Sequence, residues 1–268
     1  MTIDRNAQIL NVDRWGDYFL FTIESPAVGS GARPGQFVMV KVSSSLFPLL
    51  RRPLSIHSAG PVGIELFFKI AGPGTEILAG KKAGDAIDIL GPLGRGFTVS
   101  AGLRGKKAFL VGGGRGIAPL YFLGLELKAA GAGVTVFYGG RCQADIPLRG
   151  RFEVAGLPLH CSTDDGSCGF EGLVTDLLAR ELGRSRPDLL YVCGPDPMMK
   201  AAALMARAAG IPAEFSLESM MGCGIGACWG CVHRIRDNRD NAADSWVKIC
   251  EEGPVFPGDR ILWTDGEA

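Results

Sequence analysis

The sequence predicts a mixed α+β and α/β fold in three parts: an N-terminal antiparallel β-barrel, an α/β domain with a parallel sheet, and a small cysteine-rich lobe. Three observations predict this arrangement. Short β-rich runs separated by turn residues fill the first hundred residues, strand-like and helix-like runs then alternate, and four cysteines cluster near the C-terminal end. We place the three parts at residues 1–98, 99–217 and 218–268.

The composition is that of a globular chain with room for two cores. Its length of 268 residues exceeds the roughly 100–200 residues of one domain, and 47% of the residues are apolar against 21% charged. The 28 lysines and arginines balance 28 aspartates and glutamates, so the chain lacks the broad positive field that binds nucleic acid or an anionic membrane surface. We therefore expect neither a nucleic acid nor a membrane as partner.

Glycine content and the absence of targeting signals narrow the class further. No segment reaches the ~18 consecutive apolar residues of a transmembrane helix, and residues 1–6 lack the basic-then-apolar pattern of a signal peptide. We expect a cytoplasmic protein, in which thiols stay reduced. The 39 glycines far exceed the average share of about 7% and predict tight turns and close backbone approaches, as cofactor loops require.

The strands of the first part are expected at residues 19–23, 36–42, 64–70 and 86–90, where β-branched and aromatic residues gather. Segments rich in glycine and proline separate them, and a short helix with a threonine cap is expected at 75–78. Short strands at this spacing are typical of a small antiparallel barrel or sandwich.

The second part begins between residues 97 and 106. Strands are expected at 107–111, 134–138, 159–163 and 189–193, and helices at 117–130, 173–181 and 197–209. Strands that alternate with helices indicate βαβ units and therefore a parallel sheet. After about Glu218 the chain is too short and irregular for a separate core, so we expect a lobe organised by a metal centre.

The clustered cysteines are the strongest functional signal in the sequence. Cys223, Cys228 and Cys231 follow the spacing Cys-x4-Cys-x2-Cys, and Cys250 comes after eighteen further residues. This is the plant-type spacing of the four thiolate ligands of a [2Fe–2S] cluster. A structural zinc site is the alternative, although zinc ribbons usually have two separate short-spaced pairs. The dispersed cysteines are by default small buried apolar residues.

Two segments of the first part predict a flavin nucleotide site. In Arg52-Pro53-Leu54-Ser55 the arginine can pair with a pyrophosphate through two hydrogen bonds, and the serine can offer its hydroxyl to a ring nitrogen. About twenty residues on, Gly74 and Thr75 open the short helix, where free N–H groups can bind phosphate oxygens. Each segment alone is compatible with a solvated loop, and the two together favour a flavin site.

Two strand-to-helix loops of the second part predict a dinucleotide site. The first loop holds Gly112, Gly113, Gly114, Gly116 and Pro119, and the second begins Cys193-Gly194-Pro195. In a parallel sheet both loops lie at the carboxyl edge, where dinucleotides bind. The first loop lacks the G-x-G-x-x-G fingerprint, and a simple tight turn is the alternative reading of each loop.

Taken together, these motifs resemble the ferredoxin-reductase superfamily, whose members join a flavin-binding barrel to a nicotinamide-binding α/β domain. The segment 214–228 is similar to that of the electron-transfer subunits of NAD-dependent (type B) dihydroorotate dehydrogenases, and Cys250, Gly253 and Pro254 continue the pattern. The resemblance spans nearly the whole chain, and its C-terminal segment is the most specific part.

The resemblance implies a relay in de novo pyrimidine synthesis. In the family an FMN-containing catalytic subunit oxidises dihydroorotate, and electrons pass through the [2Fe–2S] cluster to FAD and on to NAD⁺. The complex is implied to be a heterotetramer of two catalytic and two electron-transfer subunits. Of the matching positions here, Ser55 is expected beside the reactive flavin nitrogen and Cys193 beside the nicotinamide, and the resemblance implies that FAD is bound by Arg52, Pro53, Leu54, Ser55, Lys69, Ile70, Gly74 and Thr75.

One residue departs from the family pattern, and two other functions stay open. Arg115 stands inside the glycine loop where a small or aliphatic residue is expected, so it could contact a phosphate or crowd the loop. The first alternative function is a related flavin and iron–sulfur NAD(P)H reductase with another redox partner. The second is a zinc-stabilised scaffold without enzymatic activity. No side chain need act as a general base, because hydride transfer is the chemistry of the cofactors.

Overall fold

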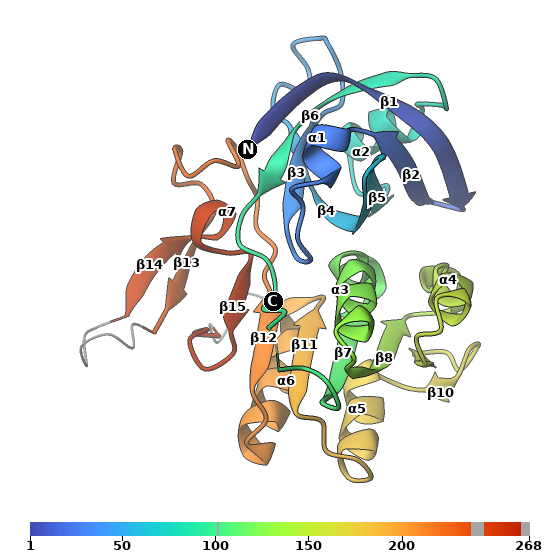
Figure 1. The fold of residues 1–268 in the computed structure, drawn as a ribbon, viewed down its shortest axis with the longest axis vertical. Helices are drawn as coiled ribbons and strands as arrows, with labels where there is room; N and C mark the ends of the chain where they lie inside the picture. The colour runs from blue at the N-terminus through green and yellow to red at the C-terminus, as the bar shows by residue number, and fades with distance from the viewer. Residues whose placement is uncertain (101, 237–243, 264–268) are drawn as a thin grey trace.

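The computed structural model describes residues 1–100, 102–236 and 244–263. An N-terminal barrel stands above an α/β domain, and the C-terminal lobe lies beside both (Figure 1). The predicted order of a barrel, a parallel-sheet domain and a C-terminal lobe is confirmed. Among the described residues no helix is long and apolar enough to cross a bilayer.

The N-terminal part is a closed antiparallel barrel with the strand order β1-β2-β5-β4-β3-β6. Apolar side chains fill its interior, where the rings of Phe21 and Phe68 meet edge to face with 5.1 Å between their centroids. The alternative of a sandwich is wrong. The strands are β1 (Thr2–Trp15), β2 (Tyr18–Glu24), β3 (Phe37–Lys41), β4 (Arg52–Ala59), β5 (Gly63–Lys69) and β6 (Ala86–Leu93), with the helices α1 (Pro26–Gly29) and α2 (Pro73–Ala79).

The sequence did not predict two of the barrel strands. Only Ala7 and Ile9 of β1 are buried, and the pairing register of β1 shifts twice, so the alternation of apolar and polar residues is interrupted. In β4 the second residue is Pro53, which has no N–H to donate to a ladder and makes the segment resemble a loop. The segment expected to be partly loop is therefore a strand from Arg52 onward.

The second part is a seven-stranded sheet with the order β10-β9-β8-β7-β11-β12-β15, in which every neighbouring pair is parallel except β12 and β15. β7 is apolar on both faces, as buried parallel strands are. The strands are β7 (Lys107–Gly113), β8 (Gly133–Gly140), β9 (Leu159–Thr163), β10 (Phe170–Glu171), β11 (Leu189–Cys193), β12 (Ala213–Ser216) and β15 (Val255–Pro257).

Helices cover both faces of this sheet. α3 and α4 pack on the face below the barrel, where Leu120 and Phe152 join one apolar cluster. α5 and α6 pack on the opposite face, where Leu178 and Met199 join another. The helices are α3 (Ala118–Ala129), α4 (Arg149–Val154), α5 (Val174–Leu182) and α6 (Asp196–Ala209), with 3-10 turns η1 (Gly114–Ile117) and η2 (Gln143–Asp145).

The C-terminal lobe is connected to both other parts. It contains the hairpin β13 (Val232–Ile235) and β14 (Ser245–Lys248), followed by α7 (Ile249–Glu252). Its last strand, β15, pairs with β12 and so extends the central sheet. The N–H group of Arg95, just after the barrel, donates to the carbonyl of Gly253. These bonds hold the cysteine-bearing lobe against the barrel and the α/β domain.

Candidate functional site

The two predicted dinucleotide loops lie side by side at the carboxyl edge of the sheet. β7 and β11 pair so that Gly112 is opposite Cys193. Gly116 approaches the second loop so closely that an added Cβ would lie 2.7 Å from the Cα of Gly194. The backbone of Gly114 has a positive φ of 53° and open space around its Cα. Gly116 is therefore required for the loops to pack, while the backbone at Gly114 is accessible to a ligand.

Cys193 is buried and uncharged. Its side chain is 2% exposed, and burial, together with the nearby Glu218 carboxylate, raises the pKa of its thiol well above the ordinary range. A thiol in such surroundings is inert as a nucleophile. The contact with a nicotinamide that the resemblance implies would therefore depend on shape, not on charge.

Arg115 neither crowds the glycine loop nor points into it. Its guanidinium donates to the carboxylate of Glu218 at 3.2 Å, at the start of the cysteine-rich segment. Both side chains are about half exposed, at 55% and 49%, so this ion pair adds little stability. It does connect the glycine loop to the C-terminal lobe.

The two predicted flavin segments also meet. Arg52 opens β4, and its guanidinium lies against Gly74 in α2, where an added Cβ would be 2.7 Å from the guanidinium carbon. Pairing of β3 with β4 places Pro53 opposite Met39 and Ser55 opposite Phe37. The segments that are about twenty residues apart in the sequence therefore form one surface at the edge of the barrel.

Two of the predicted flavin residues already have partners for their side chains. The Thr75 hydroxyl accepts hydrogen bonds from the N–H groups of Ala71 at 2.8 Å and Gly72 at 3.2 Å, so it caps α2. The Lys69 ammonium donates to the Asp145 carboxylate at 3.0 Å and to the Tyr18 hydroxyl at 3.3 Å. The side chains of Lys69 and Thr75 are therefore already engaged within the protein, and the N–H group of Ile70 donates to the carbonyl of Asp17.

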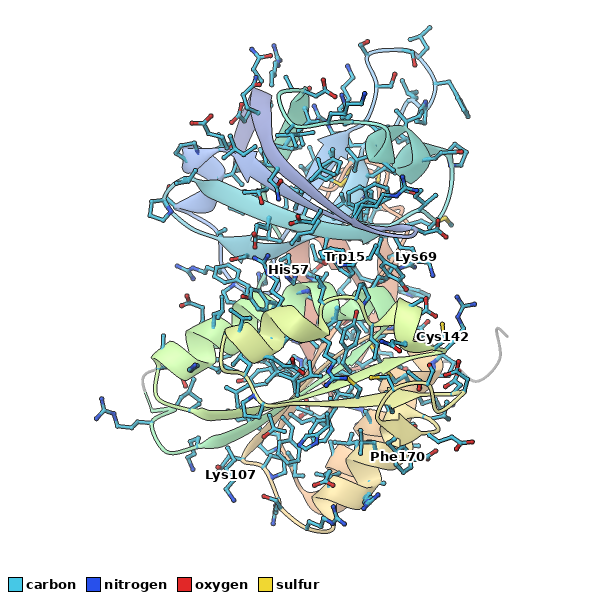
Figure 2. All side chains as sticks on the ribbon, turned by 90° about the vertical axis from the view of Figure 1, so that its right-hand side faces the viewer. Trp15, His57, Lys69, Lys107, Cys142 and Phe170 are labelled. Atoms are coloured by element: carbon cyan, nitrogen blue, oxygen red, sulfur yellow. The ribbon has the colours of Figure 1, made fainter. Side chains whose placement is uncertain are left out.

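Asp145 joins the barrel to the α/β domain. It accepts hydrogen bonds from Tyr18 at 2.8 Å, from Lys69, and from Arg141 at 2.8 Å. Burial would raise the pKa of this carboxyl, but the three donors lower it well below its ordinary range. A cleft of about 870 Å³ opens beside this contact, between Trp15 and Lys69 of the barrel and Cys142 of the α/β domain (Figure 2).

The four clustered cysteines lie close to one another. The thiol of Cys223 interacts with that of Cys228, and the thiol of Cys250 interacts with those of Cys231 and Cys223. The N–H groups of Ile225 and Gly226 point at sulfur, at 3.5 Å from Cys223 and 3.1 Å from Cys250. No three His, Cys, Asp or Glu side chains within residues 1–100, 102–236 and 244–263 converge as ligands of a single ion do.

Backbone N–H groups favour the charged form of one of these thiols. Burial alone would raise the pKa of Cys223, but N–H groups that include those of Ile225, Ala227 and Cys228 lower it to about 7. Burial and the neighbouring Cys231 thiol raise the pKa of Cys250. A metal ligand must be a thiolate, so a cation here would have to supply the remaining stabilisation of Cys250.

The cysteine loop packs directly on the barrel. Gly224 has a positive φ of 73°, and an added Cβ would lie 2.8 Å from the sulfur of Met39. Met39 is fully buried and pairs with Pro53 in the predicted flavin strand. Met39 therefore contacts the cysteine loop through its side chain and pairs through its backbone with the strand that begins with Arg52.

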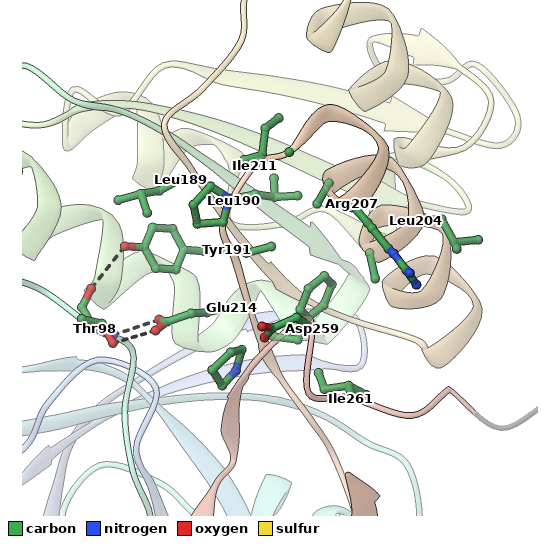
Figure 3. Close-up of a pocket in the computed structure, with 18 of the residues that line it drawn as sticks. Thr98, Leu189, Leu190, Tyr191, Leu204, Arg207, Ile211, Glu214, Asp259 and Ile261 are labelled. Atoms are coloured by element: carbon green, nitrogen blue, oxygen red, sulfur yellow. Dashed lines mark hydrogen bonds between the residues drawn. The ribbon is translucent and has the colours of Figure 1, made fainter. Parts of the chain in front are cut away.

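A second cavity lies away from these residues. It has a volume of about 680 Å³ and is bounded by β11, β12 and α6 near the amino ends of the strands (Figure 3). The carboxylate of Glu214 accepts bonds from the N–H and hydroxyl of Thr98, and the Tyr191 hydroxyl donates to the Thr98 carbonyl. None of the predicted site residues is among the described residues that line this cavity.

Sequence reasoning missed several residues where the barrel meets the α/β domain and the cysteine loop, among them His57, Asp145 and Met39. His57 lies two positions after Ser55 in β4, but the pairing of β4 with β5 shifts register between Ile56 and Ser58, so alternation does not assign its side. Asp145 and Met39 could not be assigned either, since their partners are more than ten residues away in sequence or in another part of the chain.

Comparison with known families agrees with this arrangement. Residues 110–203 match the oxidoreductase NAD-binding domain, and residues 218–262 match the iron–sulfur cluster binding domain of dihydroorotate dehydrogenase B. The fold and the site thus define a nicotinamide-linked reductase of the flavin type with an iron–sulfur lobe, and this match favours the cluster over zinc.

Curated relatives define the family. The dihydroorotate dehydrogenase B (NAD(+)), electron transfer subunit of Desulforamulus reducens is 42% identical over 247 residues, which is 91% of this chain and 92% of the relative. The same subunit of Shouchella clausii is 42% identical over 248 residues, or 92% and 93% of the two chains. The chain belongs to the family of electron transfer subunits of dihydroorotate dehydrogenase B.

Solved structures show the same fold. The structure described as an NADH-dependent reduced ferredoxin-NADP oxidoreductase, studied for flavin-based electron bifurcation, has a TM-score of 0.82 and 34% identity, and the match covers 97% of this chain and 90% of that one. A ferredoxin reductase of carbazole 1,9a-dioxygenase has a TM-score of 0.67 at 22% identity, with 80% and 69% covered, and shows the fold alone.

Proposed function

We propose that this chain passes electrons from an FMN-containing catalytic subunit, which oxidises dihydroorotate, through a [2Fe–2S] cluster and FAD to NAD⁺ in pyrimidine synthesis. Family membership supports the overall activity. The observation that carries the order of the relay is the contact of Gly224 in the cysteine loop with Met39, which pairs with Pro53 of the flavin strand. A cluster held by the cysteine loop and a flavin held by β4 would therefore lie on two segments that both adjoin Met39.

The residues at the barrel edge fit an FAD. Arg52 would pair with its pyrophosphate, and Gly74 leaves room for that guanidinium and for close approach of the phosphates. Ser55 would hydrogen-bond a ring nitrogen, and main-chain atoms of Lys69, Ile70 and Thr75 would hold the rest. When bound, FAD supplies the conversion between one-electron and two-electron transfer.

The cysteine loop fits a [2Fe–2S] cluster better than a single ion. In such a cluster each iron takes two thiolates, and the four thiols, which interact with one another, would supply them. N–H groups already aimed at the sulfurs would stabilise the negative charge of the thiolates. The cluster supplies one-electron transfer.

The glycine loop and the Cys193 loop fit NAD at the carboxyl edge of the sheet. Gly114 offers accessible backbone, and Gly112, Gly113, Gly116 and Pro119 shape the turn into α3. The neutral, buried thiol of Cys193, together with Gly194 and Pro195, would form an apolar wall that excludes water from the nicotinamide. None of these residues has to move a proton.

The partner and location follow from the same proposal. The catalytic subunit would dock where the cysteine loop reaches the surface, because Cys228 and Trp229 are exposed there. We propose a heterotetramer of two catalytic and two electron-transfer subunits in the cytoplasm. Balanced charge, 28 against 28, fits a soluble protein partner and not a nucleic acid.

One experiment tests this function. The chain is produced together with the dihydroorotate-oxidising FMN subunit, and the purified complex is analysed for FAD, iron and acid-labile sulfide and assayed for dihydroorotate-dependent reduction of NAD⁺. We expect one FAD and two irons for each electron-transfer subunit and NADH formation that requires both subunits. A complex that contains zinc without iron, or that does not reduce NAD⁺, would overturn the proposal.

A second candidate function is supported by the solved structure at 34% identity, which belongs to an NADH-dependent reduced ferredoxin-NADP oxidoreductase. In that case the partner would be a ferredoxin-dependent reductase subunit, and NADP⁺ or ferredoxin would replace dihydroorotate as the other substrate. Comparing dihydroorotate with reduced ferredoxin as electron donor for the purified complex separates the two functions.

A further inference from the structure

A buried histidine links the flavin strand to the helix that follows the glycine loop. His57 lies in β4, is 0% exposed, and contacts the first residue of α3, with its Nδ1 at 2.8 Å from the Ala118 carbonyl oxygen. Since a carbonyl only accepts, Nδ1 carries the proton and donates. Figure 2 shows His57 at the junction between the barrel and the α/β domain.

We propose that His57 is a positioning residue for hydride transfer: its bond to Ala118 sets the distance between the flavin strand and the nicotinamide loop. The inference rests on the proposed function and deepens it. The pairing of β4 with β5 shifts register between Ile56 and Ser58, so His57 lies at an irregularity of the strand, from which its imidazole contacts α3. Ala118 comes two residues after Gly116, which packs on the Cys193 loop.

The geometry of α3 makes this bond effective. α3 and the glycine loop form one rigid turn, because Gly116 and Ile117 are buried and Ile117 lies against Gly112. A shift of Ala118 relative to β4 therefore moves the glycine loop relative to Ser55. Hydride transfer needs reacting atoms about 3–3.5 Å apart, and a 1 Å misplacement can cost up to about 100-fold in rate.

The surroundings hold the imidazole in one orientation. Its ring stacks on Tyr121 of α3 with 4.7 Å between centroids and a 12° angle between planes. Among the described residues its Nε2 has no hydrogen-bond partner, so the bond to Ala118 is the polar contact that fixes the ring. The side chain is thus committed to the contact between β4 and α3.

A second contact between the barrel and the α/β domain provides a matched control for the contact made by His57. Glu65 of β5 forms an ion pair with Arg151 of α4, and the Arg151 guanidinium lies over the Tyr121 ring at 5.0 Å. Glu65 is outside the proposed flavin and nicotinamide sites. Loss of this pair should loosen the barrel from the α/β domain without a direct effect on the start of α3.

The test uses His57→Asn and His57→Gln in the complete complex with its cofactors. The Asn side chain can place an N–H where Nδ1 stands, whereas the Gln amide extends to the position of Nε2. We expect Gln to slow the transfer of hydride from NADH to FAD in single-turnover measurements by about 10- to 100-fold, and Asn to remain within about threefold of wild type. FAD and iron contents should be equal in all variants.

Two further readouts separate positioning from stability. The long-wavelength charge-transfer absorbance of nicotinamide stacked on flavin should fall in His57→Gln and persist in His57→Asn. Amide hydrogen exchange in the first turn of α3, measured without nicotinamide, should rise only in His57→Gln. Glu65→Gln should lower the melting temperature and leave the hydride-transfer rate near that of wild type.

These outcomes separate a failure of the proposed function from a failure of the role that we propose for His57. If wild-type protein does not transfer hydride from NADH to FAD, the proposed function fails. If wild type does so, but His57→Gln matches it in rate and charge-transfer absorbance, or if Glu65→Gln slows the step equally, His57 is not a positioning residue.

Discussion

At the residue scale, Arg51 and Arg52 show how two identical neighbours take different roles. The Arg51 guanidinium donates to both carboxylate oxygens of Asp88 in β6, each at 2.9 Å, and so closes the barrel. The Arg52 guanidinium lies instead against Gly74 in α2. The two neighbouring arginines therefore have different surroundings, and we propose that Arg52 binds a phosphate of FAD.

The first prediction uses this pair. Arg52→Ala removes a charge-assisted, two-bond contact worth about 1.5–3 kcal/mol, so we expect FAD to bind roughly 10- to 100-fold more weakly with unchanged iron content. Arg51→Ala is the control: it should lower the melting temperature but leave FAD affinity unchanged in the folded protein. Titration of the FAD-free chain followed by flavin fluorescence measures both. Unaltered FAD affinity in Arg52→Ala would make that arginine a surface residue only.

The second prediction concerns His57 and pH. Burial, opposed by the bond to Ala118 and assisted by the charge of Arg151, lowers the pKa of this imidazole from 6.5 to about 3. Between these values the unfolded chain binds the proton and the folded chain does not, so stability falls as the pH decreases from 6.5 toward 3. His57→Asn removes this contribution, which is at most about 1.4 kcal/mol per pH unit.

Urea unfolding at pH 7 and pH 4.5 measures the effect. We expect wild type to lose more stability than His57→Asn between the two pH values. Equal losses would mean that the imidazole is protonated in the folded protein. Among the described residues, the titratable or charged side chains that face this ring are Tyr121 from α3 and Arg151 from α4.

At the element scale, the cysteine loop is a separable electron-transfer unit. None of its four cysteines, which lie within residues 223–250, belongs to β4, α2 or the glycine loop, and it contacts the barrel through Gly224 and Met39. A change of one ligand should therefore remove the cluster without removing the flavin or nicotinamide sites.

The third prediction is the result of Cys228→Ala. We expect loss of iron and sulfide, normal NADH oxidation with an artificial dye, and loss of dihydroorotate-dependent NAD⁺ reduction in the complex. Cys142→Ala, a change at a cysteine outside the loop, should keep all three properties. Because metal binding supports folding, FAD content and retention of the catalytic subunit must be verified first. A mutant without iron that still reduces NAD⁺ at the normal rate contradicts the relay.

Elements could be predicted from the sequence where one hydrophobic period or one residue spacing is enough to identify them. They were missed where pairing with a distant strand determines the structure. Cys-x4-Cys-x2-Cys is local, and so are the glycine loop after β7 and the strands β2, β5 and β7. β1 was missed because its bulges interrupt the alternation, and β4 because it begins with Arg52 and Pro53. β15 has three residues and is a strand only because β12 offers it an edge.

The site residues follow the same rule. Arg52 and Gly74 could be paired by their spacing and chemistry, and the structure brings them into contact. The resemblance assigns Lys69 to FAD, but the sequence could not show that its ammonium donates to Asp145, which lies on a different part of the chain. Arg115 likewise has its partner, Glu218, about a hundred residues away.

At the scale of the whole molecule, the three parts contact one another at their functional segments. Asp145 holds the barrel on the α/β domain, Arg115 connects the glycine loop to Glu218, and Gly224 of the cysteine loop packs on Met39 of the barrel. The flavin, nicotinamide and cluster segments therefore adjoin in one chain. The curated relatives are named electron transfer subunits of dihydroorotate dehydrogenase B, which supports our proposal that dihydroorotate is oxidised on the catalytic subunit.

The last prediction follows from that division. The isolated chain, loaded with FAD and its cluster, should oxidise NADH with an artificial acceptor and should not oxidise dihydroorotate. The reason is that the chain holds the nicotinamide half of the relay, and the substrate half requires the FMN subunit. Parallel assays of the isolated chain and of the complex, at equal FAD concentration, measure the difference. Turnover of dihydroorotate by the isolated chain at a rate near that of the complex would show that the substrate site lies on this chain, and the assignment of the two halves would have to be reversed.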